Sequence, residues 1–238
     1  MRIDYNLSHD PFICECMNLI LTGKTTKHLV PLPNPLSDKH GLQAEAVNAF
    51  LALQKAAKHA GFNLQPASTF RDFERQKAIW VAKFNGERKV HDDQGCPIDL
   101  SCLSDWQKCQ AILRWSAAPG TSRHHWGTEI DFFDPDLLPV DKKLQLEPWE
   151  YQTGGYFQRV TNWLIANAED FDFYFPFLEQ EDKQIGLEPW HLSYFPIADI
   201  YKRSFSPEIL QMAWEDEDFV GKACLLAHID DLFEHFIL

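Results

Sequence analysis

Basic residues are few in this chain of 238 residues, which has 22 Lys and Arg against 35 Asp and Glu and a formal net charge of −13. No basic run is longer than a pair such as Lys142-Lys143 or Lys202-Arg203. A surface of this sign repels phosphate backbones, whose binding depends on lysine and arginine contacts. We therefore expect no nucleic-acid partner.

Long apolar runs are missing as well. The stretch 171–178 is interrupted by Asp172 and Pro176, and it is far shorter than the roughly 20 residues that cross a bilayer as a helix. The first eleven residues include Arg2 and Asp4 and lack the unbroken apolar core of a secretory signal. We expect no membrane segment, no membrane partner and a cytoplasmic location.

Cysteine is sparse, and its six copies include no Cys-x-x-Cys pair. This density differs from that of small secreted domains held together by disulfides. Cys14-Glu15-Cys16 offers two soft ligands, but alternate residues of a strand point to opposite faces. We expect reduced thiols without a metal.

The composition, 45% hydrophobic and 24% charged, supplies enough apolar material for a sizeable core. A chain of this length fits one domain with extensions. Residues 1–40 are rich in turn formers and are expected to cover the domain, residues 41–200 to carry the chemistry, and residues 201–238 to form a helical extension packed on the same domain. No internal repeat or linker divides the chain.

Hydrophobic periodicity and turn signals predict a mixture of helices and strands. Apolar residues recur at helical spacing over 42–60, and Gly61 follows as a helix end. Ser104 is expected to cap a helix that runs through Trp115. Further helices are expected over 71–84 and 156–168 and in two patterns after Pro207 joined near 215–218, and strands over 62–70, 129–133, 171–175 and 190–194. The pattern favours an α+β fold with helices packed on a small, mainly antiparallel sheet.

The segment 121–131, Thr-Ser-Arg-His-His-Trp-Gly-Thr-Glu-Ile-Asp, places two histidines and two carboxylates in a turn that leads into a strand. Imidazole and carboxylate groups suit zinc, and a loop-to-strand junction can aim a loop residue and a strand residue at one point. Gly127 lets the backbone turn between them. The segment therefore predicts a metal site.

A second cluster, Glu188-Pro-Trp-His191, begins another short strand. Its spacing would suit a helical pair of metal ligands, but Pro189 biases Glu188 toward extended geometry. On an extended chain the two side chains need not point the same way, so one can bind a metal while the other reaches a bound water. That division of labour suits a hydrolase.

Three motifs together resemble those of the VanY-type D-alanyl-D-alanine carboxypeptidases. These belong to a zinc peptidase superfamily that includes VanX-type dipeptidases and shares its fold with the hedgehog signalling domain. The motifs span about residues 64–195 in the family's order: Ser68-Thr-Phe-Arg71 with Gln76, Ser122-x-His124-x-x-Gly127-x-x-x-Asp131, and Glu188-x-Trp190-His191.

The resemblance implies a role for each matching residue. His124, Asp131 and His191 are expected to ligate zinc, with a fourth position left for water. Glu188 is expected to act as general base, and Arg71 to stabilise either the substrate carboxylate or the developing oxyanion. The expected substrate-binding residues are Arg71, Gln76, Ser122 and Trp190, the last of these in the pocket wall.

Two residues depart from the resemblance or lie outside it. Many members of the family carry alanine where this chain has Glu129, which on a strand shares a face with Asp131. It is expected to support a metal ligand or to contact the substrate. His125 is expected to have no direct role, and the remaining histidines are interpreted as structural.

The implied reaction is metal-assisted hydrolysis of the bond before the C-terminal D-alanine of a peptidoglycan-derived peptide or muropeptide. A D,D-enzyme trims pentapeptides, whereas an L,D-enzyme trims tetrapeptides. The expected cytoplasmic location favours L,D-activity in recycling, because a cytoplasmic D,D-enzyme would destroy cell-wall precursors. The alternatives are a zinc-containing peptidoglycan-binding module without turnover and a phage-type endolysin.

Overall fold

The computed structural model describes residues 11–33, 39–178 and 184–237. The first ten residues, on which the expected absence of a secretory signal partly rests, lie outside this range. The helices are α1 (Pro11–Leu21), α2 (Ala44–His59), α3 (Phe73–Phe84), α4 (Asp105–Leu113), α5 (Pro148–Tyr151), α6 (Gln158–Asn167), α7 (Phe195–Ser204), α8 (Pro207–Trp214), α9 (Lys222–Ala227) and α10 (Ile229–Phe236). The strands are β1 (Val30–Pro31), β2 (Gly41–Leu42), β3 (Gln65–Ser68), β4 (Glu129–Phe133), β5 (Phe173–Tyr174) and β6 (His191–Tyr194).

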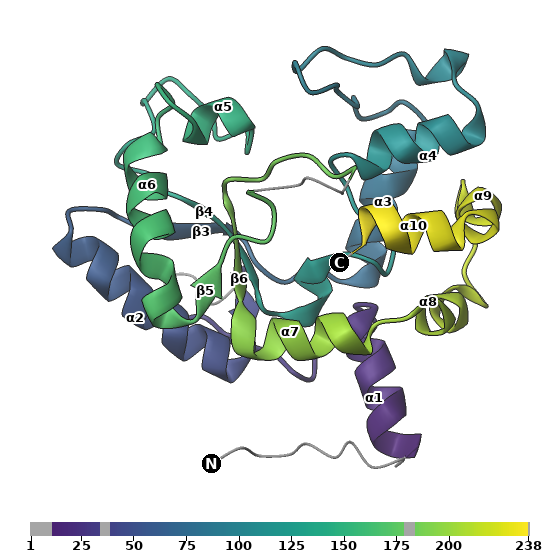
Figure 1. The fold of residues 1–238 in the computed structure, drawn as a ribbon, viewed down its shortest axis with the longest axis horizontal. Helices are drawn as coiled ribbons and strands as arrows, with labels where there is room; N and C mark the ends of the chain where they lie inside the picture. The colour runs from purple at the N-terminus through teal and green to yellow at the C-terminus, as the bar shows by residue number, and fades with distance from the viewer. Residues whose placement is uncertain (1–10, 34–38, 179–183, 238) are drawn as a thin grey trace.

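The central sheet has the strand order β3-β4-β6-β5, and each neighbouring pair is antiparallel. Strands β1 and β2 form a separate antiparallel pair. Helices lie on both sides of the central sheet, with α2 and α6 on one side and α3, α4 and α10 on the other (Figure 1). The predicted α+β fold with a small antiparallel sheet is confirmed.

Alternation along β4 and β6 divides their side chains between two environments, because successive residues of a strand point to opposite faces. Ile130, Phe132 and Leu192 are fully buried and belong to the hydrophobic core that includes α2 and α6. The intervening residues are polar and lie on the other face: Glu129, Asp131, His191 and Ser193. One face of the sheet therefore supports the fold and the other carries the chemistry.

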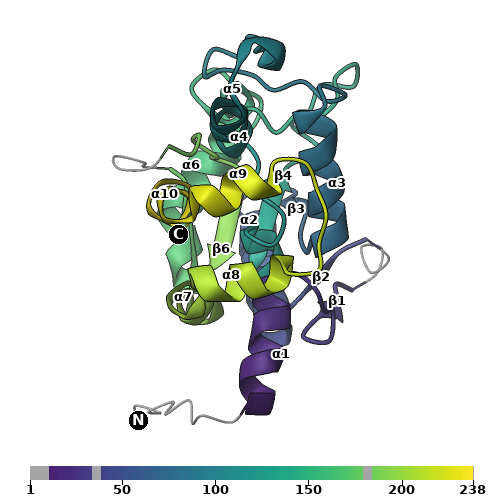
Figure 2. The ribbon, with the colours of Figure 1, turned by 90° about the vertical axis from the view of Figure 1, so that its right-hand side faces the viewer.

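A second hydrophobic core joins α1, α3 and α4 to the four C-terminal helices. Figure 2 views the molecule from the side of α8, α9 and α10, with the sheet behind them. Leu21 and Leu32, from the predicted covering segment, are buried in the second and first core respectively. The polar face of the sheet is thus turned toward a separately packed group of helices.

Most of the predicted elements are present with shifted ends. Ser104 caps α4 as expected, through a reciprocal pair of hydrogen bonds with Gln107. Helices α1, α5 and α7 and strands β1 and β2 were not predicted, and the second C-terminal pattern is divided into α9 and α10 at His228. Helix α7 starts directly after β6, with Pro196 in its first turn, so no loop signal separates the two elements.

Gly23 follows α1 and lies against the turn that contains His125. Its φ is +74°, and a Cβ atom there would collide with the ring of His125. Its carbonyl also accepts a hydrogen bond of 2.9 Å from the backbone N–H of Phe73 at the start of α3. Only glycine fits both the backbone conformation and the space.

We predict that Gly23→Ala destabilises the protein more than Gly61→Ala does. Gly61 also has a positive φ, of +89°, but nothing lies within 4 Å of its Cβ position. The Gly61 variant is expected to lose roughly 1–2 kcal/mol of unfolding free energy for the left-handed backbone, and the Gly23 variant a further ~1–3 kcal/mol for overpacking. Urea denaturation measures both, and equal losses would contradict the predicted collision with His125.

Candidate metal centre and active site

His124 lies in a 3₁₀ turn over Arg123–Trp126 that leads into β4. The turn ends at Gly127, whose φ is +70° and whose Cβ position is blocked by Leu29. The Gly127 carbonyl accepts a 2.8 Å hydrogen bond from the Gln43 backbone N–H at the start of α2. The turn is thereby fixed in direction, and it brings His124 toward the Asp131 side chain on β4.

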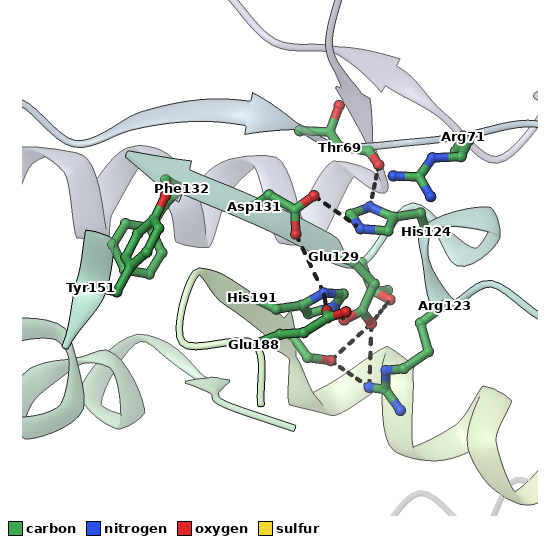
Figure 3. Close-up of polar contacts among 12 residues, drawn as sticks. Thr69, Arg71, Arg123, His124, Glu129, Asp131, Phe132, Tyr151, Glu188 and His191 are labelled. Carbon is green, nitrogen blue, oxygen red and sulfur yellow. Dashed lines mark hydrogen bonds and ion pairs between the residues drawn. The ribbon is translucent and has the colours of Figure 1, made fainter. Parts of the chain in front are cut away.

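Three buried residues offer ligand atoms that all lie within 4.8 Å of one another, namely His124, Asp131 and His191. Asp131 stands directly opposite His191 in the β4–β6 register. Its Oδ2 is 3.3 Å from His124 Nε2, and its Oδ1 is 3.3 Å from His191 Nδ1 (Figure 3). The structure therefore brings the three predicted ligands to one point.

The hydrogen bonds of the two histidines define which nitrogen carries the proton in each neutral ring. His124 Nδ1 contacts the Thr69 carbonyl, which can only accept, so Nδ1 is the donor and Nε2 presents a lone pair. His191 Nε2 lies 2.7 Å from Glu129 Oε2, so in the neutral ring the lone pair of His191 is on Nδ1. Both lone pairs face Asp131.

This donor set fits a divalent metal. Asp131 Oδ1 is buried and makes no hydrogen bond of good geometry, and two imidazole lone pairs converge beside the same carboxylate. Two nitrogens and a carboxylate oxygen suit zinc. Burial by itself lowers the pKa of His191, but Asp131, Glu129 and Glu188 outweigh it and raise that pKa well above its usual value. The same carboxylates attract a cation.

Glu129 is fully buried and ionised. Burial favours its neutral form, but Arg123 and His191 outweigh that effect and hold the pKa of Glu129 at about 2. Its Oε1 accepts hydrogen bonds from Thr128 Oγ1 at 2.8 Å, Ser193 Oγ at 2.9 Å and Arg123 Nη2 at 3.3 Å. The carboxylate is thus fixed on one side by three donors and holds His191 on the other.

The Glu188 side chain lies beside His191 in the candidate metal site. Its Oε2 lies 3.2 Å from His191 Nδ1, and its side chain is 17% exposed. The expected exclusion of a helix agrees with the structure, but the segment is not extended throughout, because Pro189 and Trp190 form a turn closed by a 3.1 Å hydrogen bond from the His191 N–H to the Glu188 carbonyl. The turn aims both side chains at the metal centre, so Glu188 stands beside the ligands.

Arg71 enters the site from the segment after β3. Its guanidinium donates to Gln76 Oε1 at 2.9 Å, and Gln76 Nε2 donates to the Ala117 carbonyl at 2.6 Å. The backbone carbonyl of Arg71 contacts His125 Nδ1 at 2.6 Å. Burial lowers the pKa of His125 to about 3, so this ring is neutral. Gln76 and His125 therefore orient Arg71, and a direct substrate contact by Gln76 stays a prediction.

A cavity of about 250 Å³ opens on the metal centre. Its lining includes all of the predicted site residues except Gln76, which is fully buried: Arg71, Ser122, His124, Asp131, Glu188, Trp190 and His191. Sequence reasoning missed Arg123 and the residues that support it. No sequence signal distinguishes Arg123 from a surface arginine, because its partner Tyr174 comes from β5, far along the chain.

A small antiparallel sheet with a buried His-Asp-His cluster on its polar face, beside a further glutamate and an arginine, is typical of metallopeptidases. The comparison with protein families gives the narrower class. The model of the VanY D-alanyl-D-alanine carboxypeptidases matches residues 39–197. The chain belongs to this carboxypeptidase family.

Two proteins of Haemophilus influenzae, each described as an uncharacterized protein, are similar in sequence. One is 66% identical over 98 residues, which is 41% of this chain and 67% of that protein. The other is 52% identical over 118 residues, which is 49% of this chain and 90% of that protein.

Two solved structures share the fold. VanYB in complex with D-alanine-D-alanine is 21% identical with a TM-score of 0.52, covering 82% of this chain and 92% of its own. The LdcB LD-carboxypeptidase is 20% identical with a TM-score of 0.50, covering 82% of this chain and 80% of its own. Within the described residues, no helix has both the length and the apolar character needed to cross a membrane.

We predict that Arg123→Met lowers the free energy of unfolding by roughly 3–5 kcal/mol, because it leaves the Glu129 carboxylate buried without its cation. The matched control is Arg203→Met, which removes a largely exposed arginine paired with Asp199 and should cost about 1 kcal/mol or less. Chemical denaturation of both variants measures the difference.

The double variant Arg123→Met/Glu129→Gln tests the cause of that loss. It removes both charges, so it should recover part of the stability that Arg123→Met loses. A double variant as unstable as the sum of the two single variants would show that Arg123 stabilises the protein by packing rather than by its charge.

Proposed function

We propose that this protein is a zinc metallocarboxypeptidase that hydrolyses the bond before the C-terminal D-alanine of peptidoglycan peptides, in cell-wall turnover or recycling. The observation that carries the proposal is the convergence of the lone pairs of His124 and His191 on the Asp131 carboxylate, with Glu188 beside them. Membership of the carboxypeptidase family supports the same reaction class.

His124 Nε2, His191 Nδ1 and an Asp131 oxygen are proposed to hold the zinc ion. Zinc held by three protein ligands would lower the pKa of a bound water to about 7 and polarise a carbonyl group. Thr69 and Glu129 contribute by fixing the two imidazole rings in the orientation that presents those nitrogens.

Glu188 is proposed to accept the proton of the attacking water and to transfer it to the leaving amine. Arg71 is proposed to bind the C-terminal carboxylate of the substrate, because its planar guanidinium offers two parallel donors. Gln76 holds one of its nitrogens at 2.9 Å, which fixes the guanidinium plane. Ser122 and Trp190 line the cavity and are proposed to contact the peptide.

The predicted division of the chain becomes part of this proposal: residues 1–40 are a covering segment, residues 41–200 the catalytic domain, and residues 201–238 a helical extension packed on it. Of these, residues 1–10, 34–38, 179–183 and 238 lie outside the described part of the chain. Phe236 and Ile237 support this division, since both line the cavity that contains the metal ligands. The cytoplasmic location and the recycling role also remain parts of the proposal.

We predict that the zinc-loaded protein removes one alanine from a muropeptide tetrapeptide and that a chelator abolishes the reaction. Mass spectrometry of tetrapeptides and pentapeptides, each with and without chelator, gives the measurement. Loss from the tetrapeptide establishes the L,D-reaction, and loss from the pentapeptide alone establishes the D,D-reaction. Binding of both peptides without hydrolysis indicates a binding module, and release of peptides only from intact wall indicates an endolysin.

We predict that Glu188→Gln lowers kcat by roughly 10²- to 10⁴-fold, the usual contribution of a general base, and leaves one zinc ion per chain. The matched control is His191→Ala, which should lose zinc as well as activity because it removes a ligand. Metal analysis and peptide hydrolysis are measured on the same samples. A Glu188→Gln protein that kept the wild-type rate would exclude the proposed mechanism.

A further inference from the structure

The cavity beside the metal centre contains two cations that the proposed mechanism does not use, Lys83 and Arg88. Lys83 lies in the last turn of α3, one turn after Ile79, and both residues line the cavity. Arg88 follows the helix, and its backbone N–H donates to the Ala82 carbonyl at 2.9 Å. This hydrogen bond folds the chain back over the end of α3 and places the two cations together.

Neither cation is neutralised by a carboxylate of the described residues. Lys83 Nζ donates to a neutral partner, Ser116 Oγ at 2.8 Å, and neither residue takes part in an ion pair within 4.0 Å in that part of the chain. Burial lowers the pKa of Lys83 to about 8, with the nearby Arg88 adding to the effect. Glu188 and Glu147 act on Lys83 only from beyond ion-pair distance. In a chain with a net charge of −13, a half-buried ammonium without a carboxylate in direct contact requires an explanation.

The position of these cations suits a substrate group some way from the scissile bond. Arg71 and Glu188 both act electrostatically on Lys83, so Lys83 is a neighbour of the reaction centre without being part of it. A second cavity, of about 420 Å³, shares Lys83, Arg88 and Trp190 with the first. A peptide whose C-terminus is at Arg71 can therefore extend past Lys83 into this second space.

We propose that Lys83 and Arg88 form a subsite for a second carboxylate of the substrate, on the amino-terminal side of the scissile bond and distinct from the C-terminal carboxylate bound by Arg71. The inference rests on the proposed function. Peptidoglycan peptides offer two sources of this chemistry: the free α-carboxylate of a γ-linked D-glutamate at residue 2 and the side-chain carboxylate of meso-diaminopimelate at residue 3. Charge-assisted hydrogen bonds from an ammonium and a guanidinium suit either carboxylate.

Four synthetic tetrapeptides ending in D-alanine test the subsite. They combine D-glutamate or its α-amide at residue 2 with meso-diaminopimelate or L-lysine at residue 3. With wild-type protein, removing the recognised carboxylate is expected to lower kcat/KM roughly 10- to 100-fold, the range for a hydrogen bond to a charged group. The effect should fall mainly on KM, because the contact is the same in the ground and transition states. The change in the peptide that lowers kcat/KM, at residue 2 or at residue 3, identifies which carboxylate the subsite recognises.

Variants connect the preference to the two residues. In Lys83→Met and Arg88→Met the peptides with and without the recognised carboxylate should be cleaved at similar rates, and Lys83→Arg should restore part of the preference. Lys58→Met is the control, since Lys58 is exposed on α2 and outside both cavities. A preference that persisted in both Met variants would overturn the assignment to Lys83 and Arg88.

Binding of the same peptides to the Glu188→Gln protein, measured by calorimetry, separates this inference from the proposed function. If all four peptides are cleaved at the same rate and bound with the same affinity, the subsite is overturned and the carboxypeptidase reaction is left intact. Absence of hydrolysis by the wild type, with a carboxylate preference in binding, would refute the proposed function and retain the subsite. Absence of binding would overturn both.

Discussion

The contact between Glu129 and His191 is the interaction on which the site depends. A buried carboxylate is stable only where donors surround it, and here Arg123, Ser193 and Thr128 supply them. The carboxylate then fixes the imidazole so that its other nitrogen faces Asp131. The orientation of the His191 ring is thus set by the buried ion pair of Arg123 and Glu129. Because both of these side chains are buried, solvent has little influence on that orientation.

The sheet divides stability and chemistry between its two faces. Ile130 and Phe132 pack into the core with α2 and α6, while Asp131 between them faces the cavity. The helices opposite the polar face pack around a second core of their own. A cavity remains between two independently packed layers, and polar side chains occupy it without disturbing either core.

Local patterns predicted much of this structure. Strand β4 has the expected bounds and Ser104 caps α4. The three residues predicted from the motifs as metal ligands lie together as a possible metal-binding group, because residue type and spacing in those motifs are both specific. The role of Arg123 was not predictable, because its partners come from β4, β5 and β6 and only the fold brings them together. The turn at Pro189 and Trp190 was not predicted for a local reason: proline excludes a helix but permits a turn as well as an extended chain.

Strand β4 contributes to the hydrophobic core with one face and to the candidate site with the other. This double role constrains how the protein can evolve. Its period of two means that a one-residue insertion or deletion within the strand would turn Glu129 and Asp131 toward the core and Ile130 and Phe132 toward the cavity. Such a change would remove Asp131 from the candidate metal site and disrupt the packed core in one step, whereas a substitution affects one face only. Length variation in this family should therefore accumulate in the loops between strands, and the short segment from the turn at His124 to the end of β4 should keep a constant length.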